Sequence, residues 1–238
     1  MKKMLYAKIK RCLKKNKFTK ELYKNLSVFK RQVITRKKRK LMQENGFEII
    51  SLIHKSFNEF RIMYFLDFGT LLGIIREKGF ISHDLDIDIG VITDDRINNN
   101  FIRQILQSKG FKLKYEYIYK NEVVEDSFVY KNIKVDISYY KNDDQYSRCW
   151  LFYIDPNRGI DNKTNRDEMN VVELTYSKIS ETKIIKINGI EMQVPMKPEK
   201  LLEEKYGLEW TKPNKNWIYW KAPSATPCNE LGYRKVYE

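Results

Sequence analysis

Apolar and polar residues alternate along the chain with two different periods, and the change of period separates predicted helices from predicted strands. In residues 46–60, GFEIISLIHKSFNEF, apolar side chains recur at the spacing of one helix face, so we predict an amphipathic helix. The bulky run RIMYFLDF at 61–68 predicts a short strand. The segment TLLGIIREKG at 70–79 predicts one or two helical turns that end at Gly79.

From Thr93 onward the pattern favours strands with helices interspersed. Thr93-Asp94-Asp95 is a candidate cap for a helix through 101–110. The run TKIIKINGIEMQV predicts a hairpin that turns at Asn188-Gly189. Residues 197–207, KPEKLLEEKYG, predict a helix entered through a proline and left through Gly207. Further strands are predicted at 111–119, 122–130 and 132–140. The order of elements indicates an α+β domain with a mixed α/β sheet flanked by helices.

One predicted strand, HDLDIDIGVI at 83–92, carries acids at alternate positions. Because successive side chains of a strand point to opposite faces, one face holds the acids and the other holds aliphatic side chains. Like charges so close together are unfavourable unless a positive charge lies among them. Two carboxylates side by side on a strand suit a hard divalent cation such as Mg²⁺, with Mn²⁺ as an alternative. The acids concerned are Asp84, Asp86 and Asp88.

Other interpretations of the acidic run are weaker. An EF-hand loop that begins at Asp84 would need glycine at its sixth position and glutamate at its twelfth, where this chain has Ile89 and Asp95. The metal-binding D-x-D of a nucleotide-sugar glycosyltransferase stays an alternative, because that chemistry also needs a diphosphate-bound cation. A solvent-facing acidic edge strand would explain the acids but not their strict alternation with leucine and isoleucine.

Residues on either side of the acidic strand extend the candidate site. Gly69-Thr70 lies where a predicted strand meets a predicted helix, and the backbone N–H groups of such a helix start can cradle a phosphate. Arg76, one or two turns further along, is a candidate for a charge-assisted contact to the same phosphate. Asp136 is the single acid within an apolar alternation, so we expect it to be the third carboxylate if its strand pairs with the acidic one. Its alternative is an exposed strand acid.

The charge of the chain is concentrated at its start. Residues 1–45 hold 17 Lys and Arg against two acids, whereas residues 46–238 hold 28 basic against 29 acidic side chains. We therefore divide the chain into a basic amphipathic helical arm, 1–45, and a catalytic domain, 46–238. An arm of this kind fits an anionic membrane surface, where each basic residue contributes about 1 kcal/mol. Nucleic acid is a less favoured partner for the same charge, and packing on the body is the other alternative.

Composition and apolar runs also bear on the expected cellular location of the protein. No apolar run approaches the roughly 18 residues needed to span a bilayer, and the basic start lacks the apolar core of a secretory signal. Three distant cysteines and two histidines do not suit a structural zinc site. We expect a cytoplasmic protein, peripheral on the inner face of the cell membrane.

The segment DFGTLLGIIREKGFISHDLDIDIGV resembles the signature of the LicD/fukutin-type phosphotransferases, a branch of the nucleotidyltransferase superfamily. In that family a G-T-L-L-G-x-x-R segment precedes a D-x-D-I-D-I-G strand. KVDIS around Asp136 resembles the family's third-acid strand, and LLEEKYGLEW around Tyr206 resembles its C-terminal helix. The chain departs from the common Trp-Asp-Asp before the core, where it has His83-Asp84-Leu85. The resemblance extends from about Phe47 to Trp217.

The resemblance implies a nucleotidyltransferase-like sheet and a transfer reaction. The donor would be CDP-linked, the transferred group phosphocholine or a polyol phosphate, and the acceptor a hydroxyl of a glycan or lipid-linked oligosaccharide. Asp86 and Asp88 would hold Mg²⁺ against the diphosphate, and Asp136 would complete the metal site and accept the proton of the attacking hydroxyl. Gly69, Thr70 and Arg76 would position the phosphates.

Two other functions use the same sequence features. An ordinary nucleotidyltransferase would transfer a nucleoside monophosphate from a nucleoside triphosphate with the same three acids and release pyrophosphate. An adaptor on an inactive fold would bind membrane or nucleic acid through the basic arm. The intact acids argue against the adaptor. Choline would require an aromatic cage, for which the sequence offers many candidates. They include Tyr64, Trp150, Trp210 and Trp217.

Overall fold

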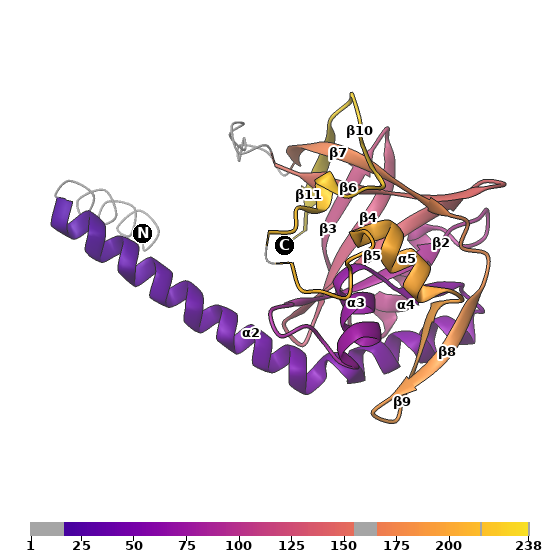
Figure 1. The fold of residues 1–238 in the computed structure, drawn as a ribbon, viewed down its shortest axis with the longest axis horizontal. Coiled ribbons are helices and arrows are strands. Elements are labelled where there is room, and N and C mark those ends of the chain that lie inside the picture. The colour runs from indigo at the N-terminus through magenta and orange to yellow at the C-terminus, as the bar shows by residue number, and fades with distance from the viewer. Residues whose placement is uncertain (1–16, 155–165, 215, 238) are drawn as a thin grey trace. The chain divides into compact units, whose positions relative to one another are not determined.

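The computed structural model describes residues 17–154, 166–214 and 216–237 (Figure 1). By its backbone contacts the chain divides into two compact units, Met1–Lys40 and Leu41–Glu238. The helices are α2 (Lys17–Glu59), α3 (Phe68–Glu77), α4 (Asn99–Ser108), α5 (Pro198–Tyr206) and the short 3-10 helix η1 (Tyr219–Lys221). The division at residues 45 and 46 stays a prediction.

Strands outnumber helices in the second unit. Their bounds are β1 (Tyr64–Leu66), β2 (Asp86–Ile92), β3 (Lys112–Tyr119), β4 (Glu122–Tyr130), β5 (Ile133–Asn142), β6 (Tyr146–Tyr153), β7 (Arg166–Ser177), β8 (Thr182–Ile187), β9 (Ile190–Pro195), β10 (Ala225–Pro227) and β11 (Gly232–Val236). Helices and a large sheet together give the α+β class, in agreement with the sequence. The nucleotidyltransferase-like arrangement of the sheet stays a prediction.

The main sheet has nine strands within the described residues and curves back on itself. Its order is β1-β2-β5-β4-β3-β11-β7-β10, and β6 pairs with both β5 and β7. The strands β5, β4, β3, β11, β7 and β6 therefore form a closed ring of pairings. Strand β2 joins this ring through a parallel pairing with β5, and β1 pairs antiparallel with β2 at the outer edge. This topology places the acidic strand β2 directly beside β5, one of the strands of the ring.

The core lies on the aliphatic side of the acidic strand. Ile87 and Ile89 are buried, as are Ile49 and Ile53 of α2 and Leu71 of α3, and all five belong to one hydrophobic cluster. The alternation of β2 therefore buries its apolar side chains and leaves its acids on the opposite face. Gly90 interrupts this pattern for a steric reason: an added Cβ would lie 2.4 Å from the ring of Phe65.

The helices begin and end at local signals. Asp67 caps α3 by accepting a hydrogen bond from the backbone N–H of Phe68, and Lys78 ends the helix in the left-handed region. The predicted cap at Thr93-Asp94-Asp95 is wrong, because α4 starts later and its cap is Asn98, whose side chain accepts from the N–H of Phe101. Asp94 instead accepts from Arg96 and Ile97 in the preceding turn.

The hairpin prediction at 182–194 is confirmed. Strands β8 and β9 pair antiparallel in a separate two-stranded sheet, and Asn188 and Gly189 have the positive φ of the turn. The predicted helix at 46–60 belongs to the longer α2, which Gly46 does not interrupt. The strand that carries the acids begins at Asp86, three residues later than the predicted start at His83. Asp84 therefore lies before β2, where its N–H donates to the carbonyl of Ile81, and the prediction that it shares the strand face with Asp86 and Asp88 is wrong.

Candidate active site

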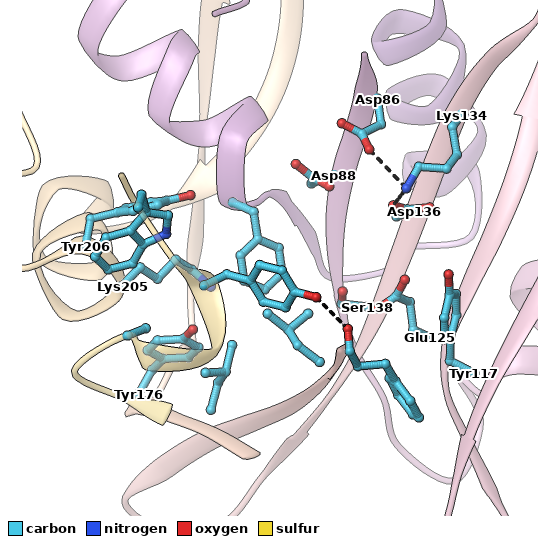
Figure 2. A pocket seen from close by; sticks show the side chains of 17 residues that line it. Asp86, Asp88, Tyr117, Glu125, Lys134, Asp136, Ser138, Tyr176, Lys205 and Tyr206 are labelled. Atoms are coloured by element: carbon cyan, nitrogen blue, oxygen red, sulfur yellow. Dashed lines mark hydrogen bonds and ion pairs between the residues drawn. The ribbon is translucent and has the colours of Figure 1, made fainter. Parts of the chain in front are cut away.

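The parallel pairing of β2 with β5 brings three carboxylates together. Asp88 is in register with Asp136, and Asp86 is in register with Lys134. Each of Asp86, Asp88 and Asp136 offers a carboxylate oxygen within 4.8 Å of the others, with Asp86 and Asp88 partly exposed and Asp136 buried. Figure 2 shows this carboxylate cluster at the end of a cavity. The strand pairing on which the third acid depended is therefore present.

A lysine lies among these acids, and the sequence reasoning missed it. The Lys134 ammonium is 2.6 Å from Asp136 Oδ2 and 3.0 Å from Asp86 Oδ2 (Figure 2). Burial lowers the pKa of Lys134, but the Asp136 and Asp86 carboxylates outweigh burial and hold that pKa above its usual value. The chain itself thus supplies part of the positive charge that the acidic strand requires.

Burial raises the pKa values of the acids, whereas it lowers the pKa of Lys134. Burial raises the pKa of Asp88 well above its usual range, and the neighbouring Asp86 and Asp136 charges raise it further. Burial also raises the pKa of Asp136, although Lys134 and a hydrogen bond from Ser127 Oγ at 2.5 Å act against this rise. The cluster is therefore short of positive charge, which is the electrostatic condition that a divalent cation would relieve.

The start of α3 fixes the position of Asp88. The Asp88 backbone N–H donates to Thr70 Oγ1 at 2.9 Å, and Thr70 is buried. A Cβ on Gly69 would lie 2.9 Å from Asp84 Oδ2 and 3.5 Å from Asp88 Oδ2. Phe68 holds a φ of 38°, a strained backbone for a residue that is not glycine. The Gly-Thr pair thus lets α3 approach the carboxylates closely, while its predicted role in phosphate binding stays a prediction.

Arg76 makes its hydrogen bonds outside the carboxylate cluster. Its guanidinium donates to the Trp210 carbonyl at 3.2 Å and to Glu77 Oε1 at 2.7 Å, and its Nε is buried without a hydrogen-bond partner. These contacts tie the end of α3 to the segment after α5. Phosphate binding by Arg76 stays a prediction, and the structure gives this residue a second, structural task.

Lys205 on the cavity wall belongs to a buried ion pair that the sequence reasoning did not identify. Asp67 is fully buried and receives the Lys205 ammonium at 2.9 Å and the Tyr140 hydroxyl at 2.5 Å. Lys205 also donates to the Tyr140 hydroxyl at 2.9 Å and lies 3.8 Å from the centre of the Phe68 ring. This network joins the start of α3 to α5 and β5. Asp67 was placed inside the strand predicted at 61–68, and its available signal was that of a candidate N-cap shortly before a predicted helix.

A cavity of about 380 Å³ opens from the carboxylate cluster into the ring of strands. Its lining includes Asp86, Asp88, Asp136, Lys134 and Lys205, and otherwise consists mainly of aromatic and aliphatic side chains. In Figure 2 the carboxylate cluster and Lys134 lie at one end, and Tyr176, Lys205 and Tyr206 lie across the cavity from Glu125 and Tyr117. The aromatic lining residues are Phe68, Tyr117, Phe152, Tyr176, Tyr206, Trp217 and Tyr219.

Of the aromatic candidates for a choline cage, Trp217 lines this cavity. Tyr64 is wrong as a candidate, because it is fully buried and its hydroxyl hydrogen-bonds His54 Nδ1 at 2.7 Å. The aromatic walls are therefore supplied largely by residues that the sequence reasoning did not single out.

Glu125 is a fourth acid of the cavity. It lies on β4 in register with Ser138 of β5, is 9% exposed, and has no hydrogen bond or ion pair within the described residues. Burial raises its pKa well above the usual range, and Asp136 raises it further. Asp84 lies beside Gly69, and burial raises its pKa to about 6. A polar residue in an alternating strand was the only signal for Glu125.

The donor set fits a hard divalent cation. Three carboxylates provide only oxygen ligands, and they converge from two adjacent strands whose register is fixed by backbone pairing. Mg²⁺ and Mn²⁺ prefer such oxygen donors, whereas the described residues near the cluster offer no cysteine or histidine set for zinc. The presence of a metal stays a prediction.

Comparison with known proteins identifies the family. The model of the family described as "LicD/FKTN/FKRP, nucleotidyltransferase domain" matches residues 61–197, which include the carboxylate cluster, α3 and most of the sheet. Since the match covers more than half of the chain, this protein belongs to the LicD/FKTN/FKRP family. The resemblance found in its sequence is therefore confirmed.

Individual relatives are more distant. The chain is 23% identical over 193 residues to Ribitol-5-phosphate transferase FKTN of Macaca fascicularis, which covers 79% of this chain and 38% of the relative. The human protein of the same name is 22% identical over the same length, with the same two shares. Uncharacterized protein W02B3.4 of Caenorhabditis elegans is 38% identical over 79 residues, 33% of this chain and 20% of the relative. The chain thus spans about two fifths of the length of the two transferases.

Proposed function

We propose that this protein transfers a phospho-substituent, phosphocholine or a polyol phosphate, from a CDP-linked donor to a hydroxyl of a cell-surface glycan and releases CMP. The observation that carries this proposal is the convergence of Asp86, Asp88 and Asp136 at the end of a cavity, in a chain of the LicD/FKTN/FKRP family. The ribitol-5-phosphate transferases among its relatives support a phosphate-group transfer.

The proposed reaction moves one phosphoryl group. The acceptor oxygen forms a bond to the phosphorus that carries the substituent, the bond from that phosphorus to the bridging oxygen breaks, and CMP leaves with the bond's electron pair. A divalent cation held by the three carboxylates would neutralise the diphosphate and stabilise the charge on the departing CMP. Asp136 would accept the acceptor's proton, a role worth roughly 10²–10⁴-fold in rate.

The remaining residues would orient the donor. The N-terminus of α3 at Gly69 and Thr70 adjoins Asp88, so its backbone N–H groups would favour a phosphate there. Arg76 would add a charge if its guanidinium left the Trp210 carbonyl. The aromatic walls would bury the cytidine or the transferred group and exclude water. We also propose that the sheet is of the nucleotidyltransferase type, which the family description and the acids on adjacent parallel strands support.

The reaction can be tested by CMP release. Purified protein with Mg²⁺ or Mn²⁺ would be incubated separately with CDP-choline, CDP-ribitol and CDP-glycerol. We expect metal-dependent CMP release from one donor, its loss in Asp86→Asn and Asp88→Asn, and its retention in Asp144→Asn, a control in the exposed turn after β5. Full turnover in Asp136→Asn would contradict the proton-acceptor role. Pyrophosphate release from CTP or ATP, with no CMP release from any donor, would favour the nucleotidyltransferase alternative.

For the basic arm we propose an anionic membrane surface as the partner and the inner face of the cell membrane as the location. No helix in the described part of the chain is long and apolar enough to cross a membrane. Within the first unit, Leu26, Phe29 and Val33 are 59%, 64% and 51% exposed and recur at i, i+3 and i+7, the spacing of one helix face. Exposed basic residues from Lys30 to Lys40 accompany them.

Apolar side chains and positive charge together suit a lipid surface better than a phosphate backbone, because a bilayer can bury the apolar stripe. Flotation with vesicles of phosphatidylglycerol at physiological salt should carry the protein, and vesicles of phosphatidylcholine should not. A Leu26→Gln/Phe29→Gln double variant should float less. Equal flotation of this variant and the parent chain would refute insertion of the stripe, and no flotation of either would refute the membrane proposal.

A further inference from the structure

Two cationic side chains line the cavity, and they differ in what neutralises them. Lys205 is 2% exposed and pairs with Asp67, which lies outside the carboxylate cluster. Lys134 pairs with Asp86 and Asp136, which are two of the three proposed metal ligands. Lys205 therefore neutralises an acid that is not a proposed metal ligand, whereas Lys134 neutralises two carboxylates that a metal would need as ligands.

Strand register fixes Lys134 in this place. It lies directly opposite Asp86 in the parallel pairing of β2 with β5, and it precedes Asp136 by two residues on the same strand. Residues two apart on a strand point to the same face, so the Lys134 side chain extends along the face that carries the acids. An ammonium there relieves the repulsion among carboxylates that burial intensifies.

A metal and this ammonium compete for the same oxygens. Asp86 Oδ2 and Asp136 Oδ2 each lie within 3.0 Å of Lys134 Nζ, and these are oxygens that a divalent cation would approach from the cavity. Two cations a few ångströms apart repel each other, so binding of the metal favours release of the ammonium. The side chain has freedom to leave, because it is 39% exposed and its long stem is flexible.

We propose that Lys134 is an internal cation that occupies the carboxylate cluster until a divalent metal binds, and that its ammonium then turns to the diphosphate of the donor. The second half rests on the proposed function, since it requires a nucleoside diphosphate at the metal. Once released, the ammonium still lines the cavity beside the cluster and is a point charge that can follow a phosphate oxygen. Lys134 would thus order the two binding events, with the metal first and the donor second.

This proposal predicts opposite changes in two affinities for one substitution. In Lys134→Met, which keeps the length of the stem and removes the charge, the protein should bind Mn²⁺ about three- to tenfold more tightly when no nucleotide is present. The same variant should bind CDP about tenfold less tightly at saturating Mg²⁺, because a charge-assisted contact is lost. Mn²⁺ would be followed by electron paramagnetic resonance and CDP by calorimetry, and neither readout requires turnover.

Two matched variants separate charge from structure. Lys134→Arg keeps the positive charge, so it should change each affinity less than Lys134→Met does. Lys131→Met removes an exposed lysine from the turn before β5, where it pairs with Glu48 at 2.7 Å, and should change neither affinity. Thermal unfolding of each variant would show that the fold is retained.

Each outcome has a defined meaning. Weaker binding of both Mn²⁺ and CDP in Lys134→Met would show that the lysine only holds the cluster together, and this would overturn the proposal. Unchanged Mn²⁺ affinity would overturn the competition, and tighter Mn²⁺ with unchanged CDP would overturn the second half alone. If the parent chain binds Mn²⁺ but neither binds CDP nor releases CMP from any CDP-linked donor, the proposed function fails while the Mn²⁺ comparison still decides the first half.

Discussion

The hydrogen bond between Thr70 and Asp88 allows a test of how the site is held in place. Thr70 Oγ1 accepts the Asp88 backbone N–H at 2.9 Å, and Thr70 is 1% exposed. In Thr70→Val the side chain keeps its shape, but the Asp88 N–H loses its acceptor at a position that water reaches poorly. An unsatisfied buried donor costs about 1–3 kcal/mol. For a chain of this size, about 2 kcal/mol corresponds to a fall of roughly 4–8 °C in Tm.

The assay combines stability with metal binding. Thermal unfolding of the metal-free protein should show the loss in Tm, and Mn²⁺ titration should show weaker binding, because Asp88 is one of the proposed ligands and its backbone is no longer fixed. Thr70→Ser, which restores the hydroxyl, should recover most of both values. A Thr70→Val protein with unchanged Tm and unchanged Mn²⁺ affinity would refute this reasoning. If CDP binding alone were weakened, the hydroxyl would act on the donor phosphate and not on Asp88.

Two further predictions concern buried charge. Lys205→Met should lower the free energy of unfolding by about 3–5 kcal/mol, because Asp67 would be left buried without its cation. A denaturant titration would measure this loss, and a loss below about 1 kcal/mol would contradict the importance of the ion pair. Burial raises the pKa of Asp84 to about 6 from an ordinary value of 3.8, so the folded metal-free protein holds a proton there that the unfolded chain has released. The stability contributed by Asp84 should therefore be present at pH 4 and be lost as the pH rises through 6. Between pH 5 and pH 7 the Tm of Asp84→Asn should fall less than the Tm of the parent chain.

The acidic strand could be predicted because its evidence is local. Alternation along one segment determines which side chains share a face, so Asp86 and Asp88 could be placed together from the sequence. Asp136 required an assumption about which strands are neighbours, and the pairing of β2 with β5 meets it. Lys134 and Glu125 could not be placed in advance, since their positions depend on the register of three strands and not on any pattern within one of them.

The continuous helix α2 shows the opposite limit of sequence reasoning. The helix was predicted to begin at Gly46, and a glycine inside a helix weakens it by about 1 kcal/mol relative to alanine. In the structure a Cβ at this position would lie 2.6 Å from the ring of Phe80, which lies between α3 and β2, so the glycine is explained by the close packing of Phe80 against the helix. Such a tertiary contact leaves no signal in the local sequence pattern. The cap of α4 at Asn98 was missed for a different reason, because several residues that can cap a helix precede α4.

The position of β11 has a consequence for how the cavity is assembled during folding. This strand, Gly232–Val236, pairs with β3 on one side and β7 on the other, and a Cβ on Gly232 would lie 2.3 Å from the Phe152 ring of the cavity wall. Its partner residues on β3 are more than a hundred positions earlier, so a very long loop must close before these contacts form. Contacts so distant in sequence slow folding. During synthesis, β3 and β7 emerge well before the strand that separates them, and the ring of strands around the cavity is completed only when residues 232–236 have been made.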